Sequence, residues 1–177
     1  LVAPARAADV DWKRVDEVLG RPGADQPGGV HKFGFPRTDL KVTLDGVAIE
    51  PALALGSWLA FQPAGGGAVV MGDLVLTQEE VNPVMSRLAE GGIEITALHN
   101  HLLRSQPATM YMHVEGHGDP AALAQALRAA LERSKTPLGA PAKPSPEAGT
   151  QGAGRDTAAI ERALGLKGTV NGKVLQV

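Results

Sequence analysis

The sequence predicts an α+β domain in which an antiparallel sheet carries helices packed on one face. Segments with the apolar patterns of strands follow one another along the chain, and only a few segments show the three-to-four residue spacing of an amphipathic helix. Strands in succession, with most helices inserted late, are typical of α+β domains with antiparallel sheets. The 177 residues, 44% of them hydrophobic, are enough to bury one good core.

The first half of the chain is expected to begin with a short helix and to continue with strands. Apolar residues recur at helical spacing from Asp11 and stop at Gly20, the pattern of an amphipathic helix with a glycine end. Alternating or continuous apolar runs then predict strands, and Asp45-Gly46 is the expected tight turn within the second run. These expected strands span residues 30–36, 40–49, 56–61 and 68–76.

The second half is expected to place two neighbouring strands between two helices. Thr77 and Glu80 form a capping box that opens the first of these helices. Asp119 and Pro120 supply the N-cap and the first-turn proline of the last one. The expected elements are a helix over 77–90, strands over 93–103 and 108–115, and a helix over 121–134.

The chain divides into four predicted regions. Residues 1–10 resemble the end of a secretory signal peptide with a small-x-small cleavage pattern, and the alternative is a disordered Ala-rich N-terminus. Residues 11–136 form the α+β domain, and 137–155 have the Pro- and Gly-rich composition of a linker. Residues 156–177 resemble the segment from Asp11 onward, which predicts the start of a truncated second repeat; a chance match of two short glycine-ended helices is the alternative.

Composition argues against several classes of function. The net charge of -2 comes from 17 basic and 19 acidic residues spread along the chain, so we expect no nucleic-acid partner. No run approaches the roughly 18 apolar residues of a membrane span. The chain has no cysteine, which leaves imidazole and carboxylate as its strong metal ligands.

The stretch from Leu98 to His117 holds four of the five histidines and is the predicted metal site. Side chains alternate between the faces of a strand, so His99 and His101 are expected to project side by side. His113 shares a face with Tyr111 and Glu115, and His117 at the following bend is the expected fourth ligand. Met110 and Met112 have the opposite parity and are assigned to the core. A structural or pH-sensing histidine cluster is the alternative.

An all-imidazole ligand set favours copper, with zinc as the alternative, and the absence of a carboxylate pair argues against magnesium or calcium. Glu115 could add a ligand or could be a solvated strand carboxylate. His31 is isolated in sequence, and its contribution to the site is left open.

The segment Ala97-Leu98-His99-Asn100-His101-Leu102-Leu103 and the Pro-, Met-, His- and Gly-containing stretch over 107–118 resemble the LppY/LpqO family of bacterial exported proteins. The helix ending in Leu19-Gly20 and the strand Lys32-Phe33-Gly34-Phe35-Pro36-Arg37 are also similar to that family. The resemblance implies a periplasmic or cell-envelope location and two copies of the unit. It implies no defined biochemical activity.

The H-x-H strand is also similar to the copper-binding strand of copper-dependent superoxide dismutases. This resemblance implies copper on His99, His101 and His113 or His117, with Arg104 attracting the superoxide anion. The chain departs from those enzymes in lacking a cysteine pair and in its predicted helices, so the likeness would mean convergence or a copper-only variant.

Three functional hypotheses follow. The leading one is an exported copper-binding protein of the envelope with superoxide dismutase activity. The second is a non-catalytic metal-binding or structural component of a cell-surface assembly or homo-oligomer. The third is a zinc hydrolase that uses Glu115 as general base.

Overall fold

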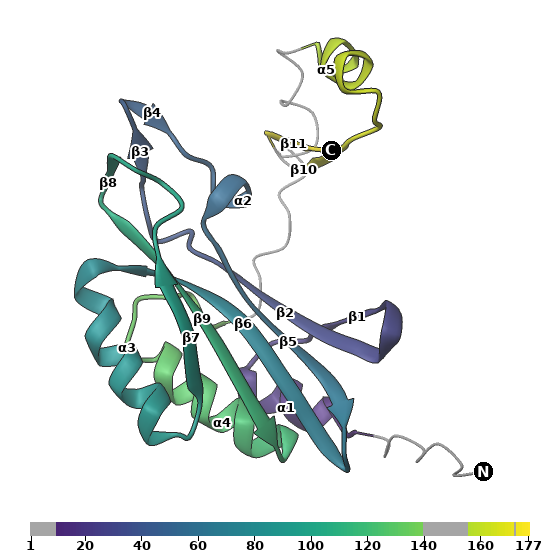
Figure 1. Cartoon of the computed structure of the whole chain (residues 1–177), viewed down its shortest axis with the longest axis vertical. Coiled ribbons are helices and arrows are strands. Elements are labelled where there is room, and N and C mark those ends of the chain that lie inside the picture. The colour runs from purple at the N-terminus through teal and green to yellow at the C-terminus, as the bar shows by residue number, and fades with distance from the viewer. Residues whose placement is uncertain (1–9, 140–155, 172) are drawn as a thin grey trace.

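The computed structural model describes residues 10–139, 156–171 and 173–177 (Figure 1). The elements in chain order are α1 (Trp12–Leu19), β1 (Ala24–Gln26), the 3-10 turn η1 (Pro27–Gly29), β2 (Val30–Pro36), β3 (Thr43–Leu44), β4 (Val47–Ala48), α2 (Pro51–Ala54), β5 (Gly56–Ala64), β6 (Gly67–Thr77), α3 (Gln78–Glu90), β7 (Glu94–His99), β8 (Ser105–Gln106), β9 (Thr109–Gly118), α4 (Pro120–Leu131), α5 (Thr157–Leu164), β10 (Thr169–Asn171) and β11 (Val174–Gln176). None of the helices within these ranges combines the length and apolar character needed to cross a bilayer.

The main sheet has six strands in the order β1-β2-β5-β6-β9-β7, and every neighbouring pair is antiparallel. Helices α1, α3 and α4 lie together on one face of this sheet (Figure 1). This arrangement confirms the predicted fold class. It also leaves the opposite face, which we call the open face, free of these three helices.

Strand alternation sends apolar side chains to the helix-covered face. Phe33 and Phe35 on β2 are buried, whereas Lys32 and Gly34, which alternate with them along the strand, are exposed. The core between sheet and helices includes Val15, Leu19, Phe33, Phe35, Leu59, Phe61, Val70, Leu74, Val84, Leu88, Met112, Val114, Leu127 and Leu131. Met112 is fully buried there and Met110 packs against the cluster, as their strand parity predicted.

A smaller apolar cluster covers one end of the open face. Val75 and Tyr111 from the sheet pack with Val42 and Leu55, and Leu40, Ile49 and Leu102 pack around them. The chain over this cluster forms α2 and a three-stranded sheet in the order β4-β3-β8. We call the part of the molecule made by α2, β3, β4 and β8 the arm. The predicted turn at Asp45-Gly46 joins β3 to β4, with φ of 49° and 82° as a tight hairpin turn requires.

The arm explains where the predicted boundaries were wrong. The strand expected over 93–103 ends at His99, whose pairing with Tyr111 is the last between β7 and β9. The chain then leaves the main sheet, and β8 pairs with β3 instead. The strand expected over 40–49 is reduced to the two-residue strands β3 and β4 for the same reason, because this stretch builds the arm.

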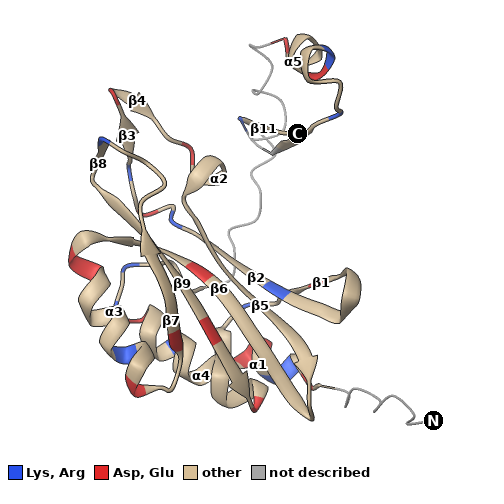
Figure 2. Ribbon diagram, in the orientation of Figure 1, with Lys and Arg blue, Asp and Glu red and all other residues tan. Residues whose placement is uncertain are grey.

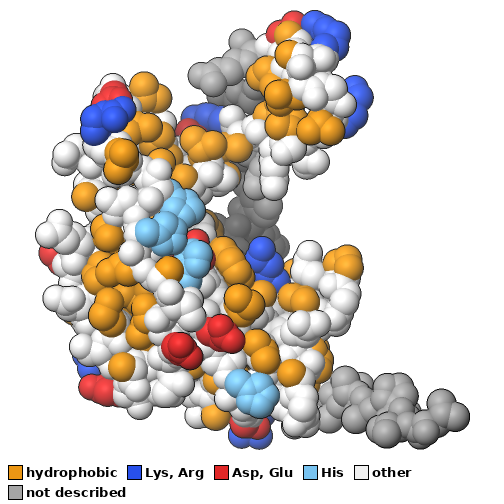
Figure 3. Space-filling model, viewed as in Figure 1, with side chains coloured by type: hydrophobic (Ala, Val, Ile, Leu, Met, Phe, Trp, Pro, Cys, Tyr) orange, Lys and Arg blue, Asp and Glu red, His pale blue; other side chains and the backbone are white. Residues whose placement is uncertain are grey.

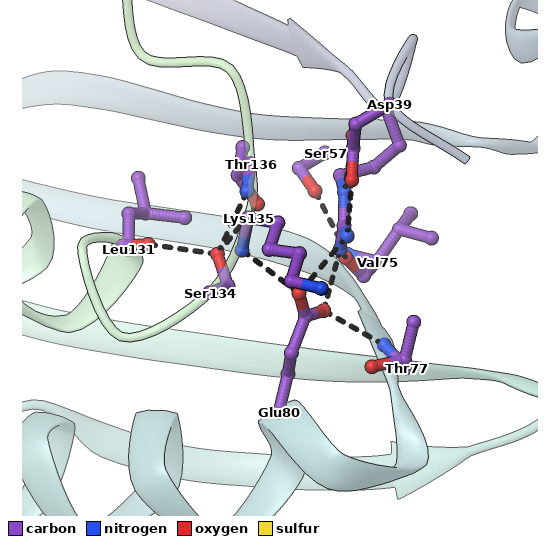
Figure 4. A network of polar contacts seen from close by, with 10 residues as sticks. Asp39, Ser57, Val75, Thr77, Glu80, Leu131, Ser134, Lys135 and Thr136 are labelled. Atoms are coloured by element: carbon purple, nitrogen blue, oxygen red, sulfur yellow. Dashed lines mark hydrogen bonds and ion pairs between the residues drawn. The ribbon is translucent and has the colours of Figure 1, made fainter.

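A buried polar network joins β2, β6, α3 and the end of α4 (Figure 4). The guanidinium of Arg37 is fully buried and donates to both carboxylate oxygens of Asp39, to both of Glu80 and to the Val75 carbonyl at 2.6–3.1 Å. The Glu80 carboxylate also accepts from the backbone N–H groups of Thr77 at 2.9 Å and Lys135 at 2.8 Å. The predicted capping box is therefore present, and its glutamate also holds the buried arginine.

The segment 156–177 repeats local features of the segment that begins at Asp11. Both eight-residue helices, α1 and α5, start at an aspartate N-cap and end at a left-handed glycine, Gly20 or Gly165. The Asp16 carboxylate accepts from the backbone N–H of Gly23, and the Glu161 carboxylate accepts from that of Gly168. In both cases the glycine lies seven residues after the acid. An antiparallel hairpin follows in both cases. The repeat stays a prediction, with this local geometry in its favour.

Candidate metal centre

His99 and His101 meet at the open face beside the arm. Their Nε2 atoms are 2.8 Å apart, and their ring centroids are 4.8 Å apart. His99 is the last residue of β7, whereas His101 lies past the end of the strand. The expectation that both would project from one strand was wrong, because the chain bends after His99. The bend nevertheless brings the two imidazoles into direct contact.

Tyr111 on β9 packs against the ring of His101. The His101 ring stacks on the Tyr111 ring with centroids 4.0 Å apart and an angle of 11° between the planes. Tyr111 is only 2% exposed, and its hydroxyl donates to the Ala54 carbonyl at 2.7 Å. Burial, together with the nearby Asp73 carboxylate, raises the pKa of Tyr111 above its ordinary value, although a hydrogen bond with Thr109 acts in the other direction. Tyr111 is thus a neutral, fixed platform for His101.

His113 extends the cluster onto the centre of the open face. It lies on β9 two residues after Tyr111, and its ring centroid is 4.7 Å from that of His99. The register of β6 and β9 places Asp73 opposite His113, with Oδ2 of the carboxylate 3.8 Å from Nε2 of the imidazole. The Asp73 side chain is 13% exposed, and its other oxygen, Oδ1, is buried without a hydrogen-bond partner among the described residues.

His117 and Glu115 lie on the same face but away from the pair. His117 pairs with Val69 and is four residues beyond His113, a distance of about 13 Å along a strand. Glu115 lies between Met71 and Glu94 in the neighbouring strands. Histidine side chains gather at one place on this face and occur again near the other end of the sheet (Figure 3). The structure therefore brings together three of the four predicted ligands and leaves His117 apart.

Arg104, the residue predicted to attract an anion, is paired within the arm. Its Nε donates to Oδ1 of Asp45 at 3.0 Å, and its Nη2 donates to Oδ2 at 2.7 Å. The hydrogen bond from Arg104 lowers the pKa of Asp45 and the same bond raises the pKa of Arg104, so both groups stay charged.

His31 is held in a different place. Its ring is buried, contacts the carboxylates of Asp16 at 2.9 Å and Asp25 at 2.7 Å, and stacks on Trp12 with centroids 5.1 Å apart. His31 lies on the helix-covered side of the sheet. Side chains alternate along β2, and the neighbouring Lys32 is on the exposed side.

In the described parts of the chain, no three His, Cys, Asp or Glu side chains already surround one point as metal ligands do. The candidate centre is therefore a contacting pair, His99 and His101, with a second pair, His113 and Asp73, directly beside it. Sequence reasoning missed Asp73 and the role of Tyr111. A lone carboxylate inside the otherwise apolar strand expected over 68–76 was the available signal for Asp73.

A family model with the description Domain of Unknown Function (DUF1259) matches residues 13–133. No curated protein and no solved structure matches the chain. These comparisons give no link to the LppY/LpqO proteins or to superoxide dismutases, so both resemblances stay predictions. The matched stretch includes nearly all of α1, the whole six-stranded main sheet, the candidate centre and α4. It covers more than half of the sequence. The chain belongs to the DUF1259 family.

Proposed function

We propose that this domain binds a transition-metal ion at His99, His101 and His113, and that copper is the best match. The contact between the first two Nε2 atoms, 2.8 Å apart, carries the proposal. Adjacent ligands at about 2.0 Å from a tetragonal ion are roughly 2.8 Å apart, whereas those of a tetrahedral ion are roughly 3.3 Å apart. The hydrogen-bond contact is thus close enough for both nitrogens to bind one ion, and imidazole ligands favour copper, with zinc as the alternative metal.

The charges around the cluster support a cation. The three strands that meet at the site, β6, β9 and β7, carry Asp73, Glu115 and Glu94 and no lysine or arginine (Figure 2). An excess of carboxylates on one face raises the local concentration of cations. These strands thus favour a metal ion over an anionic ligand at the histidines.

A non-catalytic role has more support than superoxide dismutase activity. The enzymatic hypothesis relies on Arg104 to attract superoxide, and the positive charge of this guanidinium is offset by the Asp45 carboxylate, to which it donates two hydrogen bonds. Metal binding in the periplasm or envelope, as storage or as part of a surface assembly, is the form of the proposal that we favour. The export signal that motivates this location falls mostly in residues 1–9, outside the described residues.

Electron paramagnetic resonance of the protein loaded with one equivalent of Cu(II) tests the proposal. We expect a tetragonal signal with nitrogen hyperfine structure, which His99→Ala and His101→Ala should each abolish or change to that of weakly bound copper. His117→Ala is the matched control, because this imidazole is on the same face and outside the cluster. Unaltered copper binding in the His99→Ala/His101→Ala double variant would contradict the proposal.

A further inference from the structure

Asp73 is a largely shielded carboxylate, 13% exposed, with one buried oxygen that no described group satisfies. Its Oδ1 atom is shielded from solvent and has no hydrogen-bond partner among the described residues, and its Oδ2 atom lies 3.8 Å from His113 Nε2, beyond hydrogen-bonding distance. Burying a carboxylate without partners opposes folding, so such a group is normally paired or bound to a metal. Asp73 therefore needs an explanation that the protein fold alone does not give.

The neighbours of Asp73 in the sheet offer it no lysine or arginine. The residues opposite it are Trp58 on β5 and His113 on β9. The ion pairs found in the described residues include none between Asp73 and a lysine or arginine.

We propose that Asp73 is the anionic ligand of the metal centre and completes a set of three imidazoles and one carboxylate. This inference rests on the proposed metal-binding function. Two ligand atoms of one ion are roughly 2.8–3.3 Å apart, so Asp73 Oδ2 and His113 Nε2, now 3.8 Å apart, need to approach by less than about 1 Å. The bound carboxylate offsets half the charge of a divalent ion, and the ion supplies the partner that the carboxylate lacks.

The test combines copper affinity with the stability of the metal-free protein. Asp73→Asn keeps the shape of the side chain and removes its charge. We expect its Cu(II) affinity, measured by competition with a chelator of known affinity, to fall at least about tenfold. The melting temperature of the metal-free variant should be equal to or above that of the wild type, because an unpaired buried charge is gone. Glu94→Gln removes an exposed carboxylate from the same face, so it should lower copper affinity far less than Asp73→Asn does and leave the melting temperature unchanged.

The outcomes separate this inference from the proposed function. If the wild type binds copper and Asp73→Asn binds it equally well, Asp73 is not a ligand although the histidine site stands. A metal-free Asp73→Asn protein that melts well below the wild type would mean a structural role and would also overturn the inference. Partial recovery of affinity in Asp73→Glu, which restores a carboxylate, would support it. Absence of copper binding by the wild type itself would refute the proposed function.

Discussion

The Arg37 network and the histidine cluster both draw on strand β6, yet they differ in how completely their polar atoms are satisfied. The Val75 carbonyl accepts from Arg37, and every charged group of that network has a partner within 3.1 Å. Asp73, two residues earlier on the same strand, has a buried oxygen with none. A fully paired buried network specifies the fold, whereas an incomplete one indicates a place for a ligand. The contrast supports a structural role for the first cluster and is consistent with the proposed metal binding at the second.

Removing the arginine is expected to give the largest loss of stability. Arg37→Met fills similar volume but leaves Glu80, only 9% exposed, without its ion pair. Breaking a buried pair from one side costs about 3–5 kcal/mol, and we expect a loss of this size in the free energy of unfolding measured with urea. Arg87→Met, which breaks an exposed pair with Glu90, should cost at most about 1 kcal/mol. Equal effects of the two substitutions would remove the distinction drawn for the Arg37 network.

Glu80 makes the stability of the network depend on pH. Burial alone would raise the pKa of Glu80, but hydrogen bonds from Arg37 and from the backbone of Lys135 and Thr77 outweigh it and hold the pKa below its ordinary value. A lowered pKa in the folded state adds stability above the unfolded-state value of about 4.3, and this stability is lost as the pH falls through the folded-state value.

We therefore expect Glu80→Gln to cost about 1–3 kcal/mol at neutral pH, because the buried network loses the carboxylate charge and one of its two acceptor oxygens, which an NH2 donor replaces. The difference from wild type should shrink below about pH 4.3. Urea unfolding at a series of pH values measures both. A difference that stays constant down to pH 3 would show that the Glu80 charge is not what the network uses.

The sequence predicted the helix-covered half of the fold well because its signals are local. Glycine ends, a capping box and strand parity each depend on a few neighbouring residues, and they placed the main helices and assigned Met112 to the core. The arm was missed because its short strands pair with distant partners, Thr43 with Gln106 for example. Such pairing depends on tertiary context that no local pattern carries.

The candidate site was predicted in part for the same reason. Strand parity predicted that His113 and Tyr111 lie on the same face, and in the structure both lie on β9 two residues apart, on the same face. The position of His101 depends on the bend after His99 and on stacking against Tyr111, neither of which follows from periodicity. Asp73 lies next to His113 only because of the register between β6 and β9, and this register cannot be predicted from the pattern of either strand alone.

Tyr111 offers a way to separate the support of the site from the ligands themselves. Tyr111→Phe removes the hydroxyl that donates to the Ala54 carbonyl and should cost about 1 kcal/mol of stability, while the ring that stacks on His101 is kept. We expect its copper affinity to match the wild type. Tyr111→Leu removes the stacking surface and should weaken copper binding. If both variants bind copper like the wild type, stacking does not position His101.

The smallest expected effect belongs to Arg104, which lies outside both clusters in its exposed pair with Asp45. Arg104→Met should leave the urea midpoint unchanged, because solvent-exposed ion pairs contribute little. The same variant tests the superoxide hypothesis. Electrostatic attraction of a small anion needs an uncompensated positive charge, and it weakens as salt is added. Since Asp45 offsets the charge of Arg104, any superoxide consumption by the copper-loaded protein should be the same in wild type and variant at every ionic strength. A lower rate in Arg104→Met that converges on the wild type at high salt would instead show that Arg104 steers the anion, and would restore the enzymatic hypothesis over simple metal binding.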